Sequence, residues 1–429
     1  MRYLIETYGC QMNVAESNAI EALLQGRGLE RTDSPELADC VILNTCSVRK
    51  TAENRIWGRL GFYSAVKRQH HIMLIVTGCM AERMKDELKR EAPYVDYVIG
   101  NNQKAELPGL ILGEDILDRE SYSFFETSYK EGEFSCYVPI MNGCNNFCTY
   151  CIVPYVRGRE VSRPPEEIVK EICFLDSKGV REITLLGQNV NSYKAELGGK
   201  KVDFPGLLEL IIPCLDNIRF VRFESPHPKD FDDHLIKVIA ESARVCSHIH
   251  LPMQSGNTRV LRKMNRRNTR EEFIALVDKM RDRIPGLTFS TDVMVGFPTE
   301  TEEEYEDTLS MMEYMACTEA FMYYYNPREG TKAAAMEGAI DEREKVRRLE
   351  RLINEQLERQ KEEKASRLPF DAEVLITGTS KGDSSRYLGR SEHNEYFSIE
   401  TTLSHNPGDI IWVRATELSG NTFRGAERV

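Results

Sequence analysis

The sequence lacks any long uninterrupted run of apolar residues. The first residues, Met1 to Glu6, do not form the apolar stretch of a signal peptide, and no window reaches the length that crosses a bilayer. These absences predict a cytoplasmic protein without membrane contact. Thiols stay reduced in that compartment, so the 12 cysteines are expected to be metal ligands or core residues rather than disulfide partners.

The chain also lacks an excess of positive charge. It carries 56 Lys and Arg against 68 Asp and Glu, a net charge of −12. This balance argues against indiscriminate nucleic-acid binding but leaves room for a local basic face. An apolar content of 41% and a charged content of 29% are ordinary for a soluble protein, and 429 residues suffice for several domains.

Three cysteines are crowded into the segment from Gly143 to Cys151. Cys144, Cys148 and Cys151, here called the loop triad, have the spacing C-x3-C-x2-C. Structural zinc sites and ferredoxin clusters take four protein ligands. Three thiolates without a fourth nearby suit a [4Fe–4S] cluster with one open iron. Three small hydrophobic residues brought together by chance are the weaker alternative, because this spacing is typical of metal sites.

The apolar run from Tyr137 to Met141 predicts a buried strand before the loop triad. Its cysteines would then lie at the carboxyl end of a strand, where barrel enzymes keep their chemistry. Between 135 and 365 the pattern predicts six strands, at 137–141, 182–186, 218–223, 247–251, 288–295 and 320–325, with helices between them. This alternation favours a partial (βα)6 barrel.

Residues 1–113 also alternate strands with helices. Strands are expected at 2–7, 40–44, 72–77 and 94–99, and helices at 15–24 and 105–112. Cys10, Cys46 and Cys79, here called the sheet triad, each follow one of these strands by two or three residues. A lone cysteine is usually a buried hydrophobe. In a parallel open sheet, however, the strand ends meet at one edge, so the repeated placement predicts a second metal site.

Further polar residues follow the strands of the predicted barrel. They are expected to line a shared cofactor pocket and comprise Gln188, Asn189, Glu224, Ser225, His250, Gln254 and Asp292. Arg157, Arg159 and Arg163, just after the loop triad, are predicted to contact an anionic substrate. A second basic run is either a solvated helix face or a phosphate-binding face; it consists of Arg259, Arg262, Lys263, Arg266, Arg267 and Arg270.

The remaining segments complete an α/β architecture. Residues 114–134 are acidic and irregular, as in a linker. A charged helix at 341–364 leads to residues 366–429, where short alternating segments broken by glycine predict a small five-stranded β-barrel. We therefore expect an N-terminal parallel open α/β domain, a central partial barrel and a C-terminal β-barrel. The six other cysteines are expected in the hydrophobic core; they are Cys40, Cys136, Cys173, Cys214, Cys246 and Cys317.

The loop triad resembles the signature C-x3-C-x-aromatic-C of the radical S-adenosylmethionine enzymes, with Tyr150 in the aromatic position. Two cysteine triads in this order, followed by a small β domain, resemble the methylthiotransferases over almost the whole chain. The resemblance includes the segments Thr7–Asn13, Asn44–Arg49, Thr77–Cys79, Arg157–Pro164, Leu251–Gly256 and Gly296–Thr301. Gln11-Met12-Asn13 and the segment after Cys151 most resemble the branch that acts on tRNA.

This resemblance implies two [4Fe–4S] clusters. The sheet triad would hold an auxiliary cluster that carries the sulfur to be transferred, and one S-adenosylmethionine would methylate that sulfur. A second S-adenosylmethionine, bound at the loop triad, would supply the radical that removes hydrogen from C2 of the adenine. The product would be the methylthio derivative of N6-isopentenyladenosine next to the anticodon.

The implied partners are the tRNA anticodon stem-loop and an electron donor of the flavodoxin or ferredoxin type, with a sulfur donor that the sequence does not reveal. The last domain would be a TRAM domain that engages RNA, and the protein would be a monomer. The nearest alternative is a related methylthiotransferase acting on another tRNA adenosine or on a ribosomal-protein aspartate. An alternative of another class is an iron–sulfur electron-transfer or RNA-binding protein without turnover.

Overall fold

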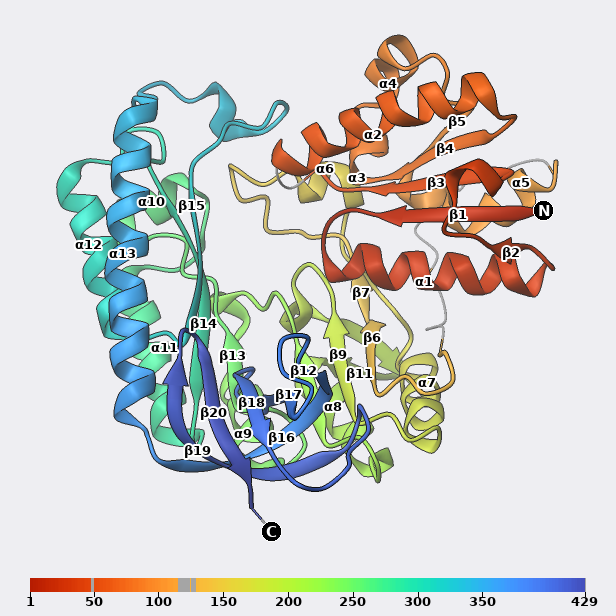
Figure 1. Cartoon of the computed structure of the whole chain (residues 1–429). Coiled ribbons are helices and arrows are strands. Elements are labelled where there is room, and N and C mark those ends of the chain that lie inside the picture. The colour runs from red at the N-terminus through yellow and green to blue at the C-terminus, as the bar shows by residue number, and fades with distance from the viewer. Residues whose placement is uncertain (48–49, 115–123, 125–128, 429) are drawn as a thin grey trace.

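The computed structural model describes all residues except 48–49, 115–123, 125–128 and 429. Figure 1 shows an N-terminal α/β domain beside a larger central domain, with a small β-barrel below the latter. The described elements end at Ile111 in the first domain and resume at Ser135 in the second. Most of the predicted linker thus lies outside the described residues.

The N-terminal domain is a parallel open sheet, as predicted, with its strands in the order β2-β1-β3-β4-β5. Its strands are β1 (Arg2–Thr7), β2 (Glu30–Arg31), β3 (Cys40–Thr45), β4 (Met73–Gly78) and β5 (Tyr97–Ile99). Its helices are α1 (Gln11–Gly26), α2 (Lys50–Gln69), α3 (Cys79–Arg83), α4 (Lys85–Glu91) and α5 (Leu107–Ile111), with a 3-10 turn η2 (Asn101–Glu106) before α5. The two-residue strand β2 was not among the four predicted strands.

The central strand β3 is buried along its whole length because helices cover both faces of the sheet. On one face, Ile20 and Leu24 of α1 pack with Ile42 of β3. On the other, Ile56 and Leu60 of α2 pack with alternate residues of the same strand. This two-sided burial explains why the strand is a continuous apolar run.

The central domain is an open barrel of six parallel strands. They are β6 (Ser135–Pro139), β9 (Glu182–Leu186), β12 (Phe220–Phe223), β13 (His248–His250), β14 (Thr288–Val295) and β15 (Glu319–Tyr324). Strands β6, β9 and β12 form one half and β13, β14 and β15 the other. A parallel bridge between Val221 and Val245 joins the halves, so the strands follow one another in chain order. The predicted partial (βα)6 barrel is confirmed.

Helices cover the outside of this barrel. They are α7 (Pro165–Ser177), α8 (Phe204–Ile211), α9 (Asp233–Glu241), α11 (Arg270–Arg283) and α12 (Glu302–Met315). The short α10 (Thr258–Lys263) packs instead against the residues that follow β14 and β15. A hairpin of β10 (Lys194–Leu197) and β11 (Lys200–Asp203) precedes α8. The main hydrophobic core lies between this helical layer and the strands.

The long helix α13 (Glu342–Ser366) leads to a closed barrel in the order β16-β17-β18-β20-β19, which confirms the predicted five-stranded barrel. Its strands are β16 (Phe370–Thr379), β17 (Arg386–Ser391), β18 (Tyr396–Glu400), β19 (Ile410–Ser419) and β20 (Thr422–Glu427). This barrel docks on the amino ends of the central strands. Arg390 pairs there with Glu182, and Arg222 donates to the carbonyls of Ser391 and Glu392 at 2.7 Å each.

Some predicted boundaries differ from the observed ones. Helix α1 begins at Gln11 instead of 15, directly after Cys10. Strand β5 begins at Tyr97 instead of 94, because Val95 closes a turn onto Ala92. The strand expected at 137–141 breaks at Ile140, whose carbonyl binds Arg163 N at 2.9 Å, and continues as β7 (Met141–Asn142).

The prediction for the six other cysteines is confirmed for four of them. It is wrong for Cys173 and Cys214, which are only half-buried. They lie on the outer layer of the central domain, on α7 and on the 3-10 turn after α8. An apolar stripe on a helix does not reveal which edge of the stripe faces solvent.

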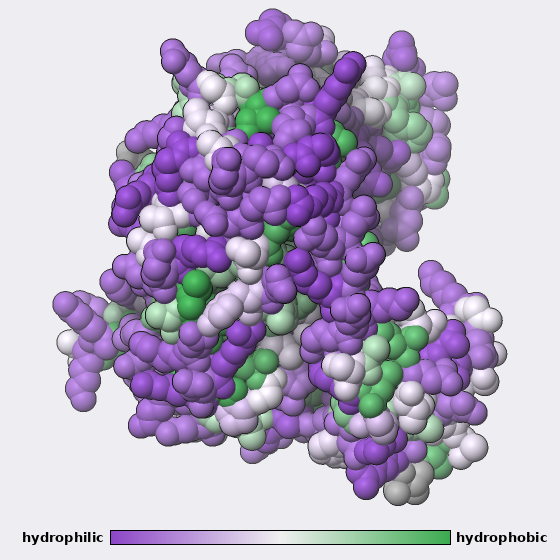
Figure 2. All heavy atoms as spheres, turned by 90° about the vertical axis from the view of Figure 1, so that its left-hand side faces the viewer, coloured by the Kyte–Doolittle hydropathy of each residue, from purple (hydrophilic) through white to green (hydrophobic). Residues whose placement is uncertain are grey.

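None of the helices in the described part of the chain is both long and apolar enough to cross a lipid bilayer. Figure 2 shows that the face carrying α12 and α13 is mostly hydrophilic, with hydrophobic residues scattered over it. Ion pairs such as Arg347–Glu302 and Arg351–Glu306 join these two helices across that face. The charged sequence of α13 is therefore that of a surface helix bound to its neighbour.

Candidate active site

The loop triad lies between β7 and α6 (Val153–Arg157). Strand β7 pairs with β8 (Val161–Ser162), and Cys144 N donates to the carbonyl of Gly158 at 3.2 Å. The turn requires glycine at 143, because its φ is +82° and a Cβ there would lie 2.0 Å from the carbonyl oxygen of Arg159. The returning segment thus fixes the position of the first cysteine.

The residues after α10 hold the same loop from the other side. The Asn265 side-chain amide donates to the carbonyls of Asn146 and Phe147, both at 3.0 Å. Arg266 is 8% exposed and places Nη1 3.8 Å from Cys148 Sγ. Sequence reasoning missed Asn265 and treated Arg266 as part of a surface run. These contacts join positions more than a hundred residues apart, and no local pattern signals them.

Two thiols of the loop triad, those of Cys144 and Cys151, are poor acids in the metal-free protein. Burial raises the pKa of Cys144 to about 11 and that of Cys151 to about 12. Both are therefore protonated at neutral pH, and a bound metal must displace their protons. Three sulfur donors on one buried loop suit iron, for which thiolates are the usual protein ligands in clusters.

The sheet triad lies at the carboxyl ends of adjacent strands. Cys46 and Cys79 directly follow β3 and β4, one residue past the strand instead of the predicted two, and Cys10 follows β1 by three. Cys10 is exposed and precedes α1, whereas Cys46 and Cys79 are 4% and 3% exposed. A Cβ at Gly9 would lie 2.6 Å from Cys46 Cβ, so the turn that carries Cys10 touches Cys46.

Neither triad surrounds a point that holds a single ion. Across the described ranges, no three His, Cys, Asp or Glu side chains form such a group. In a [4Fe–4S] cluster each thiolate binds a different iron, so cluster ligands stand farther apart than the ligands of one ion. Thiolates are the usual protein ligands of such a cluster, and the use of these cysteines as ligands stays a prediction.

The two triads lie on either side of one domain junction. Helix α6, which follows the loop triad, packs against α3, which begins with Cys79. Ile152 and Val156 form a buried apolar contact with Cys79 itself. The Asn101 side chain donates to the Val156 carbonyl at 2.6 Å and lies 3.9 Å from Cys79 Sγ.

Arg157 ties this junction together. Its guanidinium donates to Glu16 Oε1 at 2.9 Å, Asn13 Oδ1 at 2.9 Å and Asn142 Oδ1 at 3.0 Å. Glu16 also pairs with Lys104, and all three charged groups are buried. Although burial opposes ionisation, Arg157 and Lys104 outweigh it and lower the pKa of Glu16 to about 2. Arg157 thus links α1 to β7 through a carboxylate that stays ionised.

This placement corrects part of the substrate prediction. Arg157 faces Glu16, and Arg163, also buried, pairs with Glu171 at 2.7 Å, so neither guanidinium is available to an anion from solution. Arg159 is exposed and places its guanidinium carbon 4.4 Å from the centre of the Phe147 ring. Sequence reasoning could not separate the three arginines, because their carboxylate partners lie elsewhere in the chain.

The basic run that begins at Arg259 is also largely used inside the protein. Arg259 pairs with Glu304, Lys263 donates to Thr299, and Arg270 donates to the Asp307 carbonyl at 2.7 Å. Together with the buried Arg266, these contacts do not favour a continuous phosphate-binding face. Arg262 and Arg267 remain exposed.

Part of the predicted cofactor pocket is brought together at the barrel mouth. His250 Nε2 lies 3.3 Å from Asp292 Oδ2, and burial raises the pKa of the neighbouring Glu224. Burial lowers the pKa of His250, but Asp292 outweighs it, so the pKa is raised overall. Gln254 continues this edge, since its N–H donates to the Asp292 carbonyl at 2.8 Å.

The other predicted pocket residues make contacts away from the His250–Asp292 pair. Gln188 Oε1 accepts from Gly143 N at 2.6 Å and so supports the turn before the loop triad. Asn189 donates to Asp230 at 2.9 Å, and Ser225 is exposed at the end of β12. Tyr150 packs into an apolar cluster with Phe297 and Tyr325, and burial raises its pKa. Cofactor contact by these residues stays a prediction.

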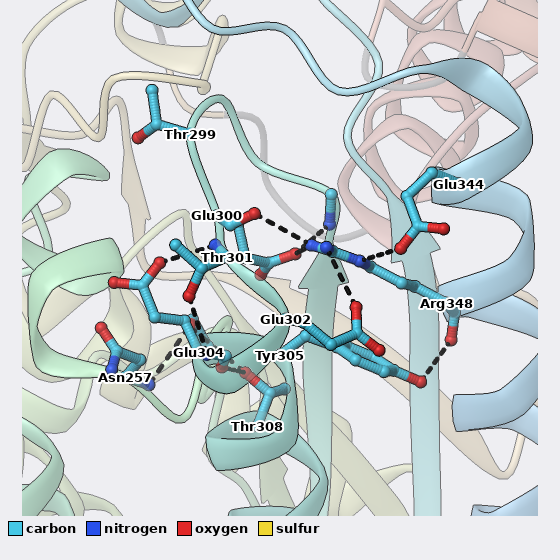
Figure 3. A network of polar contacts seen from close by, with 12 residues as sticks. Asn257, Thr299, Glu300, Thr301, Glu302, Glu304, Tyr305, Thr308, Glu344 and Arg348 are labelled. Atoms are coloured by element: carbon cyan, nitrogen blue, oxygen red, sulfur yellow. Dashed lines mark hydrogen bonds and ion pairs between the residues drawn. The ribbon is translucent and has the colours of Figure 1, made fainter.

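A buried arginine–carboxylate network fixes the loop after β14 (Figure 3). Arg348 of α13 binds Glu300 at 2.9 Å, Glu302 at 3.2 Å and Glu344 at 2.8 Å. Glu300 also accepts from Gly296 N at 2.6 Å, and burial raises its pKa to about 7 although both donors lower it. The network joins the Gly296–Thr301 loop to the helix that carries the C-terminal barrel.

Comparison with known proteins agrees with this architecture. Residues 138–312 match the radical SAM superfamily, and residues 2–100 match an uncharacterized protein family, UPF0004. A radical S-adenosylmethionine methyltransferase, TsrM from Kitasatospora setae, has a similar fold with a TM-score of 0.58 and 14% identity, covering 78% of this chain and 77% of that one. The cobalamin-dependent radical enzyme OxsB gives a TM-score of 0.52 at 11% identity, covering 84% and 56%. At these identities the likeness concerns the fold alone.

The fold and the cysteine loop thus define a radical SAM protein, and that superfamily implies S-adenosylmethionine and a [4Fe–4S] cluster as cofactors. Among curated proteins, tRNA-2-methylthio-N(6)-dimethylallyladenosine synthase of Treponema denticola is 44% identical over 99% of both chains. The protein of that name from Bacteroides fragilis is 44% identical over 99% of this chain and 95% of its own. The chain belongs to the family of the tRNA-2-methylthio-N(6)-dimethylallyladenosine synthases.

Proposed function

We propose that this protein installs a methylthio group on C2 of N6-dimethylallyladenosine next to the anticodon of tRNA. The reaction is proposed to use two S-adenosylmethionine molecules and two [4Fe–4S] clusters. The observation that carries the proposal is the junction between the two domains. There α6, which follows the loop triad, packs against α3, the helix that begins with Cys79 of the sheet triad. Sulfur insertion at a carbon radical needs two reactive centres facing one substrate.

The residues have separate roles in this proposal. Cys144, Cys148 and Cys151 hold one cluster, and Cys10 and its two partners in the sheet triad hold the other. When bound, the first cluster supplies a radical from S-adenosylmethionine, and the second supplies the sulfur.

The chain's own residues hold these centres in place. Asn265 and Gln188 fix the cysteine loop through its backbone, and Arg157 holds the two domains in register. His250 and Asp292 present a hydrogen-bonded pair at the barrel mouth, where they orient the polar groups of the bound cofactor. The exposed Cys10 leaves the sheet triad accessible from the side of α1.

The remaining parts of the proposal concern partners. The C-terminal barrel is proposed to engage the tRNA anticodon stem-loop, as a TRAM domain would. A flavodoxin or ferredoxin is proposed to deliver electrons in the cytoplasm to a monomeric enzyme, and the sulfur donor is not assigned.

The decisive experiment measures iron and sulfide in anaerobically purified protein. Replacing the sheet triad by alanine (Cys10→Ala, Cys46→Ala, Cys79→Ala) is expected to remove about half of the iron. The variant should still cleave S-adenosylmethionine to 5′-deoxyadenosine but should insert no sulfur into tRNA. A double variant of the half-buried Cys173 and Cys214 to alanine controls for cysteine loss and should keep both clusters.

Three outcomes would contradict the proposal. If the triple variant keeps all its iron, these cysteines do not hold a cluster. If nucleosides from a strain lacking the gene keep the methylthio group while a ribosomal peptide loses mass, the substrate is the protein and not the tRNA. Absence of 5′-deoxyadenosine from the reconstituted wild type would favour a protein without turnover.

A further inference from the structure

A group of two rings and one cation lies where the cysteine loop meets α6, with Phe147 half-buried and the other two residues exposed. Its members are Phe147, Tyr155 and Arg159, here called the ring patch. The rings of Phe147 and Tyr155 meet edge to face, with centroids 6.2 Å apart and planes at 87°. The Arg159 guanidinium carbon lies 4.4 Å from the centre of the Phe147 ring. Tyr155 is 49% exposed, which is high for an aromatic residue between two buried neighbours, Pro154 and Val156.

The surroundings of the ring patch show that its exposure is local. Pro154 and Val156 turn inward on α6, and Val156 packs against Cys79. Arg157, two residues before Arg159, is bound to a carboxylate, whereas Arg159 lies over a ring. A guanidinium held over a ring still has N–H donors along its edge, and these can bind a phosphate.

The ring patch is joined to the loop triad through the chain itself. Phe147 directly precedes Cys148, and its carbonyl is held by Asn265 at 3.0 Å. The carbonyl oxygen of Arg159 packs against Gly143, the residue before Cys144. Any group stacked on the ring patch therefore lies beside the loop triad.

We propose that the ring patch stacks a base of the RNA loop adjacent to the target adenosine, with Arg159 contacting the phosphate between them. Aromatic rings and arginine edges are the surfaces on which single-stranded nucleic acids stack, and every base has a flat face to offer. Stacking the base next to the target adenosine would hold the RNA loop open, so that the target base can turn towards the barrel of the central domain. This inference rests on the proposed function and adds to it the surface that receives the loop.

The test uses the anaerobic holoenzyme and a synthetic RNA stem-loop. The stem-loop carries N6-dimethylallyladenosine at the target position and the fluorescent base 2-aminopurine next to it. Wild-type protein and Tyr155→Phe should quench the fluorophore on binding, because both keep a ring at 155. Tyr155→Ala should not quench it and should bind about 5- to 150-fold more weakly, the loss expected for one stacked base. Arg159→Gln should lower the salt dependence of binding by about 0.7 in log–log slope, the value for one phosphate contact.

A matched control comes from another exposed aromatic residue of the central domain, on α7. Phe174 on α7 is 47% exposed, meets Tyr129 edge to face, and has Lys178 Nζ 5.4 Å from its ring centre. Phe174→Ala should bind the stem-loop within about twofold of wild type. Thermal unfolding of each variant checks that the fold is kept.

The outcomes separate this inference from the proposed function. If wild type neither binds nor modifies the stem-loop, the proposed function fails. If wild type does both and Tyr155→Ala binds as tightly with the same quenching, the ring patch does not stack RNA. If Tyr155→Ala keeps RNA binding but is no longer reduced by flavodoxin, the patch docks the electron donor, and the RNA proposal is overturned.

Discussion

Removing the charge of Arg157 should uncouple the two cysteine domains. In the folded protein Arg157 and Lys104 outweigh burial and lower the pKa of Glu16 to about 2, against an ordinary value of 4.5. A difference of this size corresponds to about 3 kcal/mol of stability at neutral pH. Because the folded-state pKa is depressed, this stability is present above about pH 4.5 and is lost as the pH falls towards 2.

We therefore expect Arg157→Met to cost about 2 to 4 kcal/mol at pH 7, since the buried Glu16 loses its guanidinium partner while its contact with Lys104 remains. The cost should shrink below about pH 4, where Glu16 of the variant becomes protonated. Glu16→Gln combined with Arg157→Met should lose less than the sum of the single changes, because no uncompensated carboxylate remains.

Urea unfolding of the metal-free chain measures these differences, and hydrogen exchange of the α6 amides reports on the junction. Arg159→Met is the matched control, because Arg159 is exposed on the same segment, and it should change the free energy of unfolding by less than about 0.5 kcal/mol. If Arg157→Met unfolds like this control and α6 exchanges at the wild-type rate, the ion pair with Glu16 does not hold the domains together.

Three further predictions concern the loops around the site. Glu300→Gln should be as stable as wild type near pH 5 but more stable near pH 8 by about 1 to 3 kcal/mol. The folded-state pKa of Glu300 is raised to about 7, so wild type loses stability as the pH rises through that value. Thermal unfolding at both pH values checks this, and an equal stability difference between the two proteins at both would contradict it. Gly143→Ala should reduce the iron bound per chain. The new Cβ would lie 2.0 Å from the Arg159 carbonyl oxygen, in a backbone conformation that disfavours side chains. Full iron content by elemental analysis would count against this. Asn265→Ala should speed proteolytic nicking of the cysteine loop by about tenfold, because two carbonyls lose their donor; unchanged cleavage, followed by mass spectrometry, would show that the loop is held by other contacts.

Sequence periodicity predicted the architecture well where strands are buried on both faces. Strands β9 and β14 have the predicted bounds, because each is rich in apolar and β-branched residues and lies between segments of different character. The end of β6 was misjudged, since the chain at Ile140 switches partners from one strand to another without a change in hydrophobicity. The docking of the C-terminal barrel through Arg222 and Arg390 was not predictable, because both partners of each contact look like ordinary surface residues in the sequence.

The same limit applies to the site. The spacing of the loop triad is local, so sequence alone indicates a cluster, and the sheet triad follows from strand topology. The roles of Arg157 and Arg159 were not separable, since only the fold brings Glu16 to one of them and Phe147 to the other. Asn265 gave no signal, because an asparagine after a helix is common and its partners lie far away in the chain.

The open barrel determines how a large substrate can approach. Among the described strands, β6 and β15 form the two margins and do not pair with each other, while the C-terminal barrel covers the amino ends of the central strands. Helix α1 packs against β6, and α13 packs against β15. Between these margins the strand wall is not closed by backbone pairing, so a nucleotide turned out of a folded RNA need not pass a complete ring of strands. A closed ring of eight strands would instead require it to enter from above, past every surrounding loop.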